Sequence, residues 1–468
     1  MHSTPSRRSN FFVEFWPTSV AVVLAIVGLA NCDGGRAATG NPNPLPIHPI
    51  GFYATSYEKT PTAAAMTAMG RILFFDTTLS ASGRMSCANC HDPAHAMGPA
   101  NSLSVQLGGP KLQDVGNRAA PSLKYLQTSP AFTEHYFGSE GNDSEDQGPT
   151  GGLTWDGRFN QPHEQATAPL LSSVEMANTD SHDVIAKLRN SPSAVQFRQT
   201  YGDHVLDAGN EPLAWHGLLL ALEVFQQSPA DFYPYTSKYD AMLRKQVALS
   251  ASEQRGLALF NDTQRGNCAT CHVSVIQSGA FPQFTDYGLI ALGVPRNAAI
   301  PSNANPAYFD LGLCGPLRTD LQSHPEYCGR FKTPTLRNVA LKKSFFHNGV
   351  LHSLEDVVRF YSERDVRPEK FYPRKADGSV DKFNDLPAVY RGNLDSTAPF
   401  NQPNRSQPLF TDAEIVDLLA FLNTLTDGYT TPRRAPPHAT LSKTIPAWRP
   451  RVLATTTPAA PGATACCR

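Results

Sequence analysis

The sequence has almost no excess charge and few charged residues. Its 468 residues contain 40 Lys and Arg against 41 Asp and Glu, so the net charge is −1, and only 17% of the residues are charged. A protein that binds nucleic acid through its phosphates needs a basic surface, which this balance does not provide. Nucleic acid is therefore excluded as a partner, and the function must be sought in particular motifs.

The sequence has only 9 cysteines, and four of them lie in one pattern that occurs twice. Residues 87–91 read CANCH and residues 268–272 read CATCH. In this spacing two thiols can bond the vinyl groups of one haem, while the next residue, His91 or His272, binds its iron. A zinc site would need a second Cys or His pair close by, and a thioredoxin-type pair would lie in a βαβ pattern; neither context is present. The sequence predicts two covalently bound haem c groups. The thiols that would hold them are Cys87, Cys90, Cys268 and Cys271.

The N-terminus has the pattern of an export signal. Two Arg residues precede an apolar run over 20–30, which is too short to span a bilayer. We therefore expect residues 1–32 to be an export signal and the mature protein to be periplasmic. Residues 29–32 (LANC) resemble a lipoprotein cleavage box, so membrane attachment through a lipid anchor on Cys32 and a free exported protein are both open.

Two further cysteines, Cys314 and Cys328, flank one short loop. In the oxidising compartment that an export signal implies, a bridge between them would contribute roughly 3 kcal/mol through loop-closure entropy. We expect this disulfide; the alternative is a pair of free thiols.

Helical patterns precede both haem motifs. Apolar residues recur at helical spacing over 62–75, ahead of the first motif. Ser250 and Glu253 form a capping-box pattern ahead of a helix over 254–260, which leads into the second motif. The strongest helical pattern of the first half, 212–227, comes before that box and is ended by a proline. The same order, a helix followed by a haem motif, therefore occurs twice in the chain.

We expect a mainly α fold of two cytochrome-c-like haem domains with long irregular loops. The N-terminal domain would span 51–238 and the C-terminal domain 239–430. Helices over 353–361 and 415–425 belong to the second, and the latter, opened by a Thr-x-x-Glu capping box, would close it. Pro-rich residues 33–50 indicate a flexible tether, and residues 431–468, rich in Pro, Ala and Thr, indicate a disordered tail.

The first haem iron has no good second axial ligand in the sequence. His95 is four residues from His91 and would share its face of a helix, and 96–133 contains no His. Met97 and His135 remain as weak alternatives. We expect an open distal position, which can bind peroxide, whereas a capped iron only transfers electrons.

Several motifs together resemble the di-haem cytochrome c peroxidase and MauG family. The likeness runs from about Thr62 to Thr426. Besides the two CxxCH motifs, the residues that carry it are WDGR at 155–158, Gln165, Glu175, TPTLRN at 333–338 and FHNG at 346–349.

The resemblance implies a role for each of these residues. The first haem would be the peroxidatic one, with His91 as proximal ligand and Gln165, Pro169 and Glu175 shaping its distal pocket. Trp155 would relay electrons between the haems. The second haem would be the electron-transfer centre, held by His272 and by Tyr361, which lies fourteen residues after the His of the FHNG turn. Without the resemblance, Trp155 and Tyr361 would be interpreted as core residues, and Glu175 as a buried, hydrogen-bonded carboxylate.

Tyr rather than Met at position 361 is typical of the MauG-like branch. The Trp that MauG carries two residues before its second CxxCH is replaced here by Gly266, so its protein-modifying chemistry cannot be carried over. The family's inter-haem calcium site is a further expectation, against which Ala119 stands where the family's Asn-Ala-Pro segment begins.

By this resemblance the protein is a peroxidase that reduces hydrogen peroxide, with Glu175 moving a proton between the two peroxide oxygens. Its electrons would come from a small exported donor, a cytochrome c or a cupredoxin. Two alternatives stay open: a MauG-like oxidase that modifies a partner protein, and a non-enzymatic di-haem electron carrier in which both irons are capped.

Overall fold

The computed structural model describes residues 49–137, 146–277, 279–400 and 405–430. The predicted export signal, Cys32, most of the predicted tether and the predicted C-terminal tail lie outside the described residues. The chain divides into two compact units, Met1–Thr55 and Ser56–Arg468. A domain boundary at 238/239 therefore stays a prediction.

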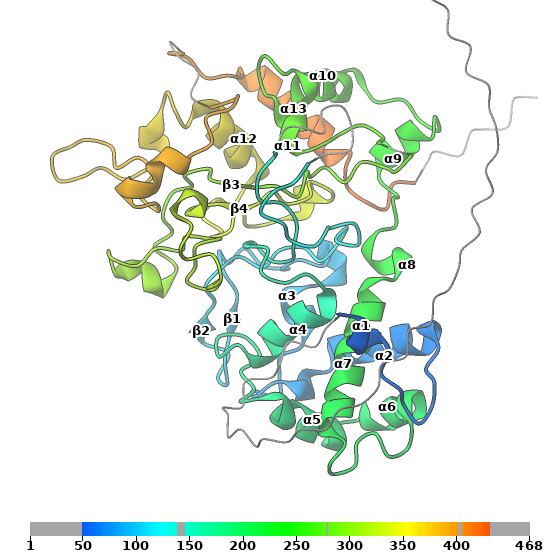
Figure 1. The fold of residues 1–468 in the computed structure, drawn as a ribbon. Helices are drawn as coiled ribbons and strands as arrows, with labels where there is room; N and C mark the ends of the chain where they lie inside the picture. The colour runs from blue at the N-terminus through cyan, green and yellow to red at the C-terminus, as the bar shows by residue number, and fades with distance from the viewer. Residues whose placement is uncertain (1–48, 138–145, 278, 401–404, 431–468) are drawn as a thin grey trace, which may run out of the picture. The chain divides into compact units, whose positions relative to one another are not determined.

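The described secondary structure is mainly helical (Figure 1). The α-helices are α1 (Pro49–Tyr53), α2 (Ala63–Phe75), α3 (Cys87–Cys90), α4 (Pro162–Leu171), α5 (Ser181–Asn190), α6 (Ala194–Tyr201), α7 (Glu211–Gln226), α8 (Pro229–Phe232), α9 (Lys238–Leu243), α10 (Ala251–Asn261), α11 (Cys268–Cys271), α12 (Leu354–Glu363) and α13 (Asp412–Asn423). The 3₁₀ helices are η1 (Thr77–Leu79), η2 (Pro93–His95), η3 (Pro301–Ala304), η4 (Pro325–Tyr327), η5 (Val339–Leu341), η6 (Pro368–Lys370) and η7 (Ala388–Asn393).

The strands are short and form two antiparallel pairs. Strand β1 (Leu107–Gly108) pairs with β2 (Asp114–Val115), with Leu107 opposite Val115. Strand β3 (Leu289–Ile290) pairs with β4 (Phe331–Lys332), with Ile290 opposite Phe331. Long irregular connections join these elements, so the predicted mainly α fold is confirmed. Among the described residues, no helix has the length and apolar character needed to cross a bilayer.

Two predicted helices begin directly after their capping residues and therefore three residues earlier than predicted, at Ala251 rather than 254 and at Asp412 rather than 415. The Thr62 side chain accepts a hydrogen bond from the Ala65 amide at 3.1 Å and opens α2. Both predicted capping boxes are present: one at Ser250 and Glu253 opens α10, and one at Thr411 and Glu414 opens α13. Helix α7 ends at Gln226, and the proline that was expected to end it instead starts α8.

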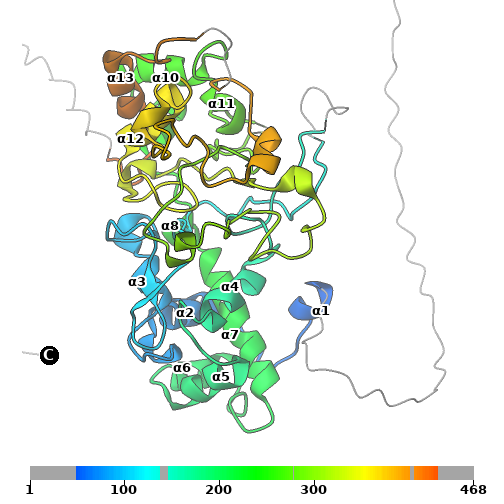
Figure 2. The ribbon, with the colours of Figure 1, turned by 90° about the vertical axis from the view of Figure 1, so that its left-hand side faces the viewer.

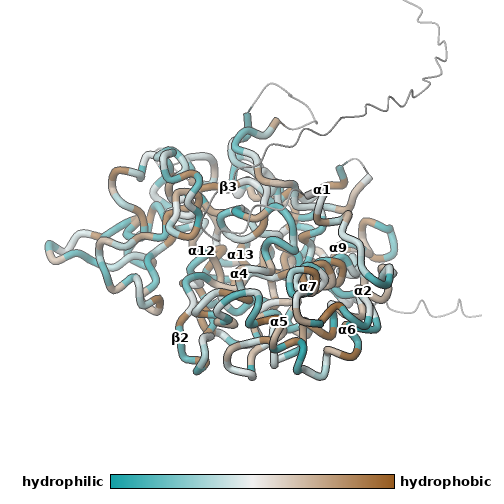
Figure 3. Tube along the Cα trace, turned by 60° about the horizontal axis from the view of Figure 1, so that its bottom comes forward, coloured by the Kyte–Doolittle hydropathy of each residue, from teal (hydrophilic) through white to brown (hydrophobic). Residues whose placement is uncertain are grey.

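Each haem motif follows a helix that is packed closely against a second helix. In Figures 1 and 2, α2 lies beside α7, and α10 lies beside α13. Apolar segments gather on α2 and α7 in Figure 3. At the first crossing Gly70 meets the backbone carbonyl of Ala221, and at the second Gly256 meets the backbone carbonyl of Asp417. A Cβ at either glycine would collide with that carbonyl, so both crossings require glycine.

The second crossing also carries an aromatic core beneath the second motif. Phe421 of α13 lies 5.1 Å from Phe260 of α10, ring centroid to centroid, and 5.7 Å from Tyr239 of α9. Tyr239 in turn makes an edge contact with Phe284 at 5.3 Å. Aromatic pairs in such edge-to-face arrangements contribute roughly 0.5–1.5 kcal/mol beyond the area they bury. This packing fixes the segment that carries Phe284.

Substituting Gly70 tests the first crossing. Gly to Ala inside a helix normally stabilises it by roughly 0.5–1 kcal/mol, but here the new methyl group would meet the Ala221 carbonyl. We expect Gly70→Ala to lower the free energy of unfolding by about 1–3 kcal/mol through overpacking, measured by denaturant titration followed by circular dichroism. Gly392→Ala, where nothing lies within 4 Å of the added Cβ, is the control. A Gly70→Ala protein as stable as this control would contradict the close crossing.

Candidate haem and peroxide site

The first CxxCH motif forms a single helical turn, α3. The Ser86 amide donates to the Asn89 side chain at 2.7 Å and starts this turn, so Cys87 and Cys90 lie one turn apart on the same side. His91 follows directly, and its Nδ1 lies 3.1 Å from the Met97 carbonyl oxygen. Because a carbonyl only accepts hydrogen bonds, Nδ1 carries the proton and Nε2 keeps the lone pair that binds a metal.

The second motif, α11, is built in the same way. The Nδ1 of His272 lies 2.9 Å from the Phe284 carbonyl oxygen, which again leaves Nε2 for a metal. Burial lowers the pKa of His91 and of His272 to about 4, so both imidazoles are neutral. The four thiols show the opposite effect, because burial raises their pKa values to about 11 or 12. Redox-active thiols need lowered pKa values, so these residues fit haem attachment better.

The residues that hold these two carbonyls were not identified from the sequence. The Leu123 amide donates to the Met97 carbonyl at 3.1 Å, and the Leu336 amide donates to the Phe284 carbonyl at 3.2 Å. One residue earlier in each segment, a hydroxyl donates to the preceding carbonyl at 2.6 Å: Ser122 to Ala96, and Thr335 to Gln283. A short repeat in the sequence could have revealed these residues, because Pro-Ser-Leu at 121–123 matches Pro-Thr-Leu at 334–336.

Glu175 lies close to the first motif. Its backbone is held by two hydrogen bonds: its amide donates to the Ser172 carbonyl at 3.0 Å, and its carbonyl accepts from the Gly109 amide at 2.8 Å. Its carboxylate is near enough to Cys87 and Cys90 to add to their raised pKa values. The Glu175 side chain is exposed. The surrounding protein nevertheless raises the pKa of its carboxyl group by desolvation, while a hydrogen bond with Ser172 and the charge of Arg158 act to lower that pKa.

Gln165 and Pro169 come from one helix, α4, and are four residues apart, so they share a face of that helix. Pro169 lies inside the helix, and its carbonyl accepts from the Met176 amide at 3.0 Å. This bond ties α4 to the turn that carries Glu175. The three residues expected to shape the distal pocket therefore belong to one connected segment, 162–176.

Of the two weak alternatives for the sixth ligand, Met97 uses its backbone carbonyl on the His91 side, and the His135 side chain has another partner. The carbonyl of Met97 supports His91 from the proximal side. The Nδ1 of His135 lies 2.6 Å from the Asp146 carboxylate, on an exposed segment. An open distal position at the first haem stays a prediction.

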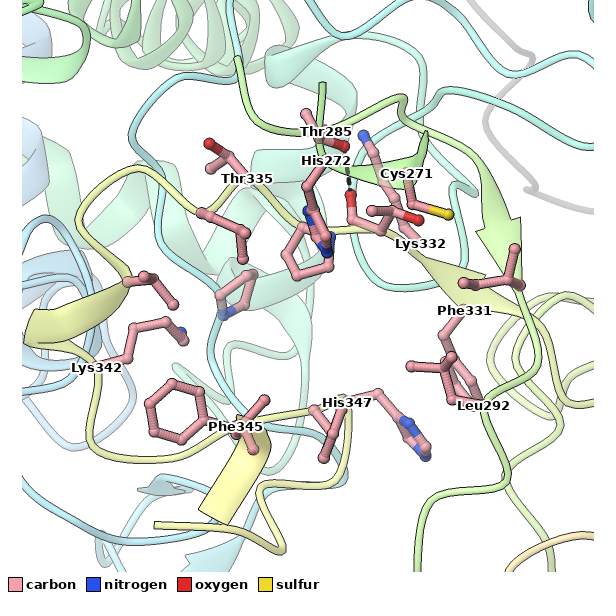
Figure 4. A pocket seen from close by; sticks show the side chains of 18 of the residues that line it. Cys271, His272, Thr285, Leu292, Phe331, Lys332, Thr335, Lys342, Phe345 and His347 are labelled. Carbon is pink, nitrogen blue, oxygen red and sulfur yellow. Dashed lines mark hydrogen bonds between the residues drawn. The ribbon is translucent and has the colours of Figure 1, made fainter. Parts of the chain in front are cut away.

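A large, mainly apolar cavity adjoins the second motif (Figure 4). Its wall includes Cys268, Cys271 and His272, together with Tyr361 of α12. The Tyr361 ring stacks on Phe400 at 5.4 Å between centroids. Burial raises the pKa of Tyr361, with a further contribution from the two thiols, so its phenol is neutral unless a metal binds the oxygen. The sequence-predicted ligand thus lies in the cavity that the second motif lines.

Trp155 lines the same cavity and is held by segments from both halves of the sequence. Its indole Nε1 donates to the Ala119 carbonyl at 2.7 Å, and its own carbonyl accepts from the Lys332 amide at 2.8 Å. The ammonium group of Lys332 also donates to the Gly152 carbonyl and to the Ser129 hydroxyl. Trp155 is therefore buried and fixed at both its side chain and its backbone.

Beside Trp155 lies a buried ion cluster that the sequence did not reveal. Arg118 donates to Asp156 at 2.7 Å and, through two nitrogens, to Asp310 at 2.7 Å. Burial acts to raise the pKa of each Asp, but Arg118 holds both values below the ordinary range. No periodicity or spacing predicts such a cluster, because its members lie far apart in the chain.

Cys314 and Cys328 are joined by a disulfide, with their Cα atoms 4.9 Å apart. Both are buried in a small core cluster with Leu313, Leu321 and Tyr327. The bridge therefore closes the loop that contains η4 and holds it against this cluster.

Known proteins share this arrangement. A family model described as di-haem cytochrome c peroxidase matches residues 64–248. Methylamine utilization protein MauG of Paracoccus denitrificans is 32% identical over 392 residues, which cover 80% of this chain and 91% of that protein. Cytochrome-c peroxidase IdrP2 of Denitromonas iodatirespirans is 26% identical over 374 residues, 77% of this chain and 88% of that protein.

A solved structure agrees. The crystal structure of the diheme peroxidase BthA from Burkholderia thailandensis aligns with a TM-score of 0.68 and 34% identity, and covers 80% of this chain and 88% of that one. The resemblance predicted from the motifs is confirmed. The chain belongs to the di-haem cytochrome c peroxidase family, and is an oxidoreductase of the peroxidase type with two haem cofactors.

Proposed function

We propose that the protein reduces hydrogen peroxide at its first haem site, with electrons that a small exported cytochrome c or cupredoxin delivers through the second. The observation that carries this proposal is the position of Glu175, whose carboxylate acts electrostatically on Cys87 and Cys90. A carboxyl group with a raised pKa, placed beside a haem motif, is suited to proton transfer during peroxide cleavage.

Cys87, Cys90 and His91 would hold one haem, and Cys268, Cys271 and His272 the other, by thioether bonds and by Nε2. Bound there, the haems supply the irons that bind peroxide and exchange electrons. The neutral imidazoles, fixed by the Met97 and Phe284 carbonyls, are in the form that such binding needs.

Glu175 would perform the acid–base work. Its carboxylate takes the proton from one peroxide oxygen and returns it to the other, so that water leaves. Desolvation raises its pKa, which makes it a better base than an ordinary Glu. Gln165 and Pro169, on the same face of α4, would limit the space in which peroxide lies.

Trp155 and Tyr361 would serve the electron-transfer side. Trp155 is held between segments of both halves, which suits a relay whose orientation must not change. Tyr361 would ligate the second haem, since it lies in the same cavity wall as His272. An anionic phenolate donates charge and favours oxidised iron, so Tyr361 would lower the potential of that haem.

The expected compartment is the periplasm. The disulfide between Cys314 and Cys328 supports an oxidising compartment, because such bonds are rare in reducing cytosol. An N-terminal lipid anchor at Cys32 would tether the protein to the membrane, and a chain processed without lipidation would be free.

A MauG-like oxidase is the second candidate, favoured by the 32% identity to that protein. The surroundings of Gly266 count against it. A Cβ there would lie 2.9 Å from the Phe410 ring and 3.0 Å from the Leu259 carbonyl, so a Trp would not fit without rearrangement. Peroxide turnover with a reduced cytochrome c, measured without any protein substrate, separates the two candidates.

Covalent attachment predicts a defined haem count. The wild-type chain should contain two c-type haems, and the Cys87→Ala/Cys90→Ala and Cys268→Ala/Cys271→Ala variants one each, because thioether bonds need both thiols. A pyridine haemochrome assay per mole of protein measures this. Cys314→Ala/Cys328→Ala, which removes only the disulfide, should keep both haems. One c-type haem in the wild type would refute the assignment.

Glu175→Gln should keep both haems but slow peroxide cleavage by about 10²–10⁴-fold, the usual contribution of one positioned proton carrier. Since the base must be deprotonated, the wild-type rate should fall as the pH drops below the raised pKa of Glu175, and the variant should lose this acidic limb. Stopped-flow mixing with peroxide over a range of pH measures both. The exposed Glu369→Gln is the control, and equal rates in the two variants would leave Glu175 a structural role only.

Replacing Tyr361 tests the second haem. Loss of an anionic ligand should raise the potential of that haem and change its ferric spectrum, while peroxide binding at the first haem persists. Spectroelectrochemical titration of Tyr361→Phe measures the shift against Tyr390→Phe, a residue of η7 packed on the disulfide cluster. If Tyr361→Phe matches the wild type in potential and spectrum, Tyr361 is a core residue.

A further inference from the structure

Several cationic side chains line the cavity, and Lys342 is one that none of the steps above uses. Lys342 follows η5, and Figure 4 shows its ammonium group directed into the cavity that Cys271 and His272 also line. Its charge also reaches the first motif: burial is the main cause of the lowered pKa of His91, and Lys342 adds to it. Lys342 therefore acts on both haem-binding regions.

Lys342 has no carboxylate partner in the described part of the chain. The ion pairs of those residues do not include it, in contrast to Arg118, which has two Asp partners. Only burial shifts its pKa, which is lowered to about 8, so the ammonium form predominates at neutral pH. Lys342 is half-buried, and a partly desolvated charge without a counter-charge is costly; the anions that a haem would bring into such a cavity are its propionates.

The residues around Ala119 do not fit the calcium ion that the resemblance implied. Its side chain has no oxygen, its amide donates to the His347 carbonyl at 2.8 Å, and its carbonyl accepts from Trp155 at 2.7 Å. The neighbouring carboxylates, Asp156 and Asp310, are both occupied by Arg118. Among the residues that the structure describes, no group of three or more His, Cys, Asp and Glu could hold a metal. Calcium prefers six to eight oxygen ligands, which these residues do not supply.

We propose that the Lys342 ammonium supplies a fixed positive charge to the haem-binding cavity, and that this chain uses no calcium ion for that purpose. With haem bound, the charge would balance a propionate and would stabilise reduced iron. The inference rests on the two haems of the proposed function, and not on the identity of the substrate.

The test uses the purified di-haem protein. Elemental analysis should find no stoichiometric calcium, and neither EDTA nor added CaCl₂ should move the two haem potentials. Lys342→Met should shift at least one potential downward, because removal of a positive charge disfavours the reduced iron. Lys342→Arg, which keeps the charge, should restore it. The control is Lys245→Met, at an exposed position that does not line the cavity, which should leave both potentials unchanged.

Three outcomes would overturn the inference. They are about one calcium ion per chain whose removal changes the potentials, a Lys342→Met protein with wild-type potentials, or equal shifts in Lys342→Met and Lys245→Met. If Lys342→Met does not incorporate haem, the metal analysis and the Lys342→Arg potentials still decide the matter. A protein with normal potentials but no peroxide turnover would refute the proposed function alone.

Discussion

Both haem motifs depend on one hydrogen bond, from Nδ1 of the motif His to a backbone carbonyl. The residues that offer these carbonyls, Met97 and Phe284, both have a left-handed backbone, with φ of 55° and 54°. That conformation costs a non-glycine residue roughly 1–2 kcal/mol. It persists because the Leu123 and Leu336 amides hold the same carbonyls, and at Phe284 also because the ring packs against Tyr239. In each half, a second segment of the chain thus helps to keep one carbonyl oxygen in place.

The junction of the two halves is polar, although the cavity beside it is mainly apolar. Arg118 joins Asp156, next to Trp155, to Asp310 in the second half of the chain. A buried ion pair adds little stability over an apolar pair, but breaking it leaves an uncompensated charge, which costs about 3–5 kcal/mol. The cluster therefore selects one arrangement of the segments around Trp155. The relay role proposed for Trp155 would require such a fixed arrangement more than it would require extra stability.

Local signals predicted much of the fold, and long-range packing decided the rest. The capping boxes at Ser250 and Thr411 were predictable because each cap and its partner lie three residues apart. The haem motifs were predictable for the same reason. Glu175 and Tyr361 could be located only through a family pattern, because nothing in their neighbourhood distinguishes them from core residues. Lys342 and Arg118 were missed, since a lysine or arginine in a sequence is normally exposed, and only the folded chain encloses them between distant segments.

In both halves the same kind of hydrogen bond orients the motif His. The halves differ in the side chains that neighbouring segments place near each motif. The first motif has the carboxyl group of Glu175 nearby, from the turn after α4, and the second has the phenol of Tyr361, from α12. A carboxyl with a raised pKa can carry protons, whereas a phenolate oxygen is a hard ligand that favours oxidised metal. Since the repeated Pro-Ser/Thr-Leu segments build only the shared side, the chemical difference proposed for the two sites would arise from segments outside the repeat. A duplicated binding unit could in this way acquire two chemistries while the hydrogen bond of each motif His stays the same.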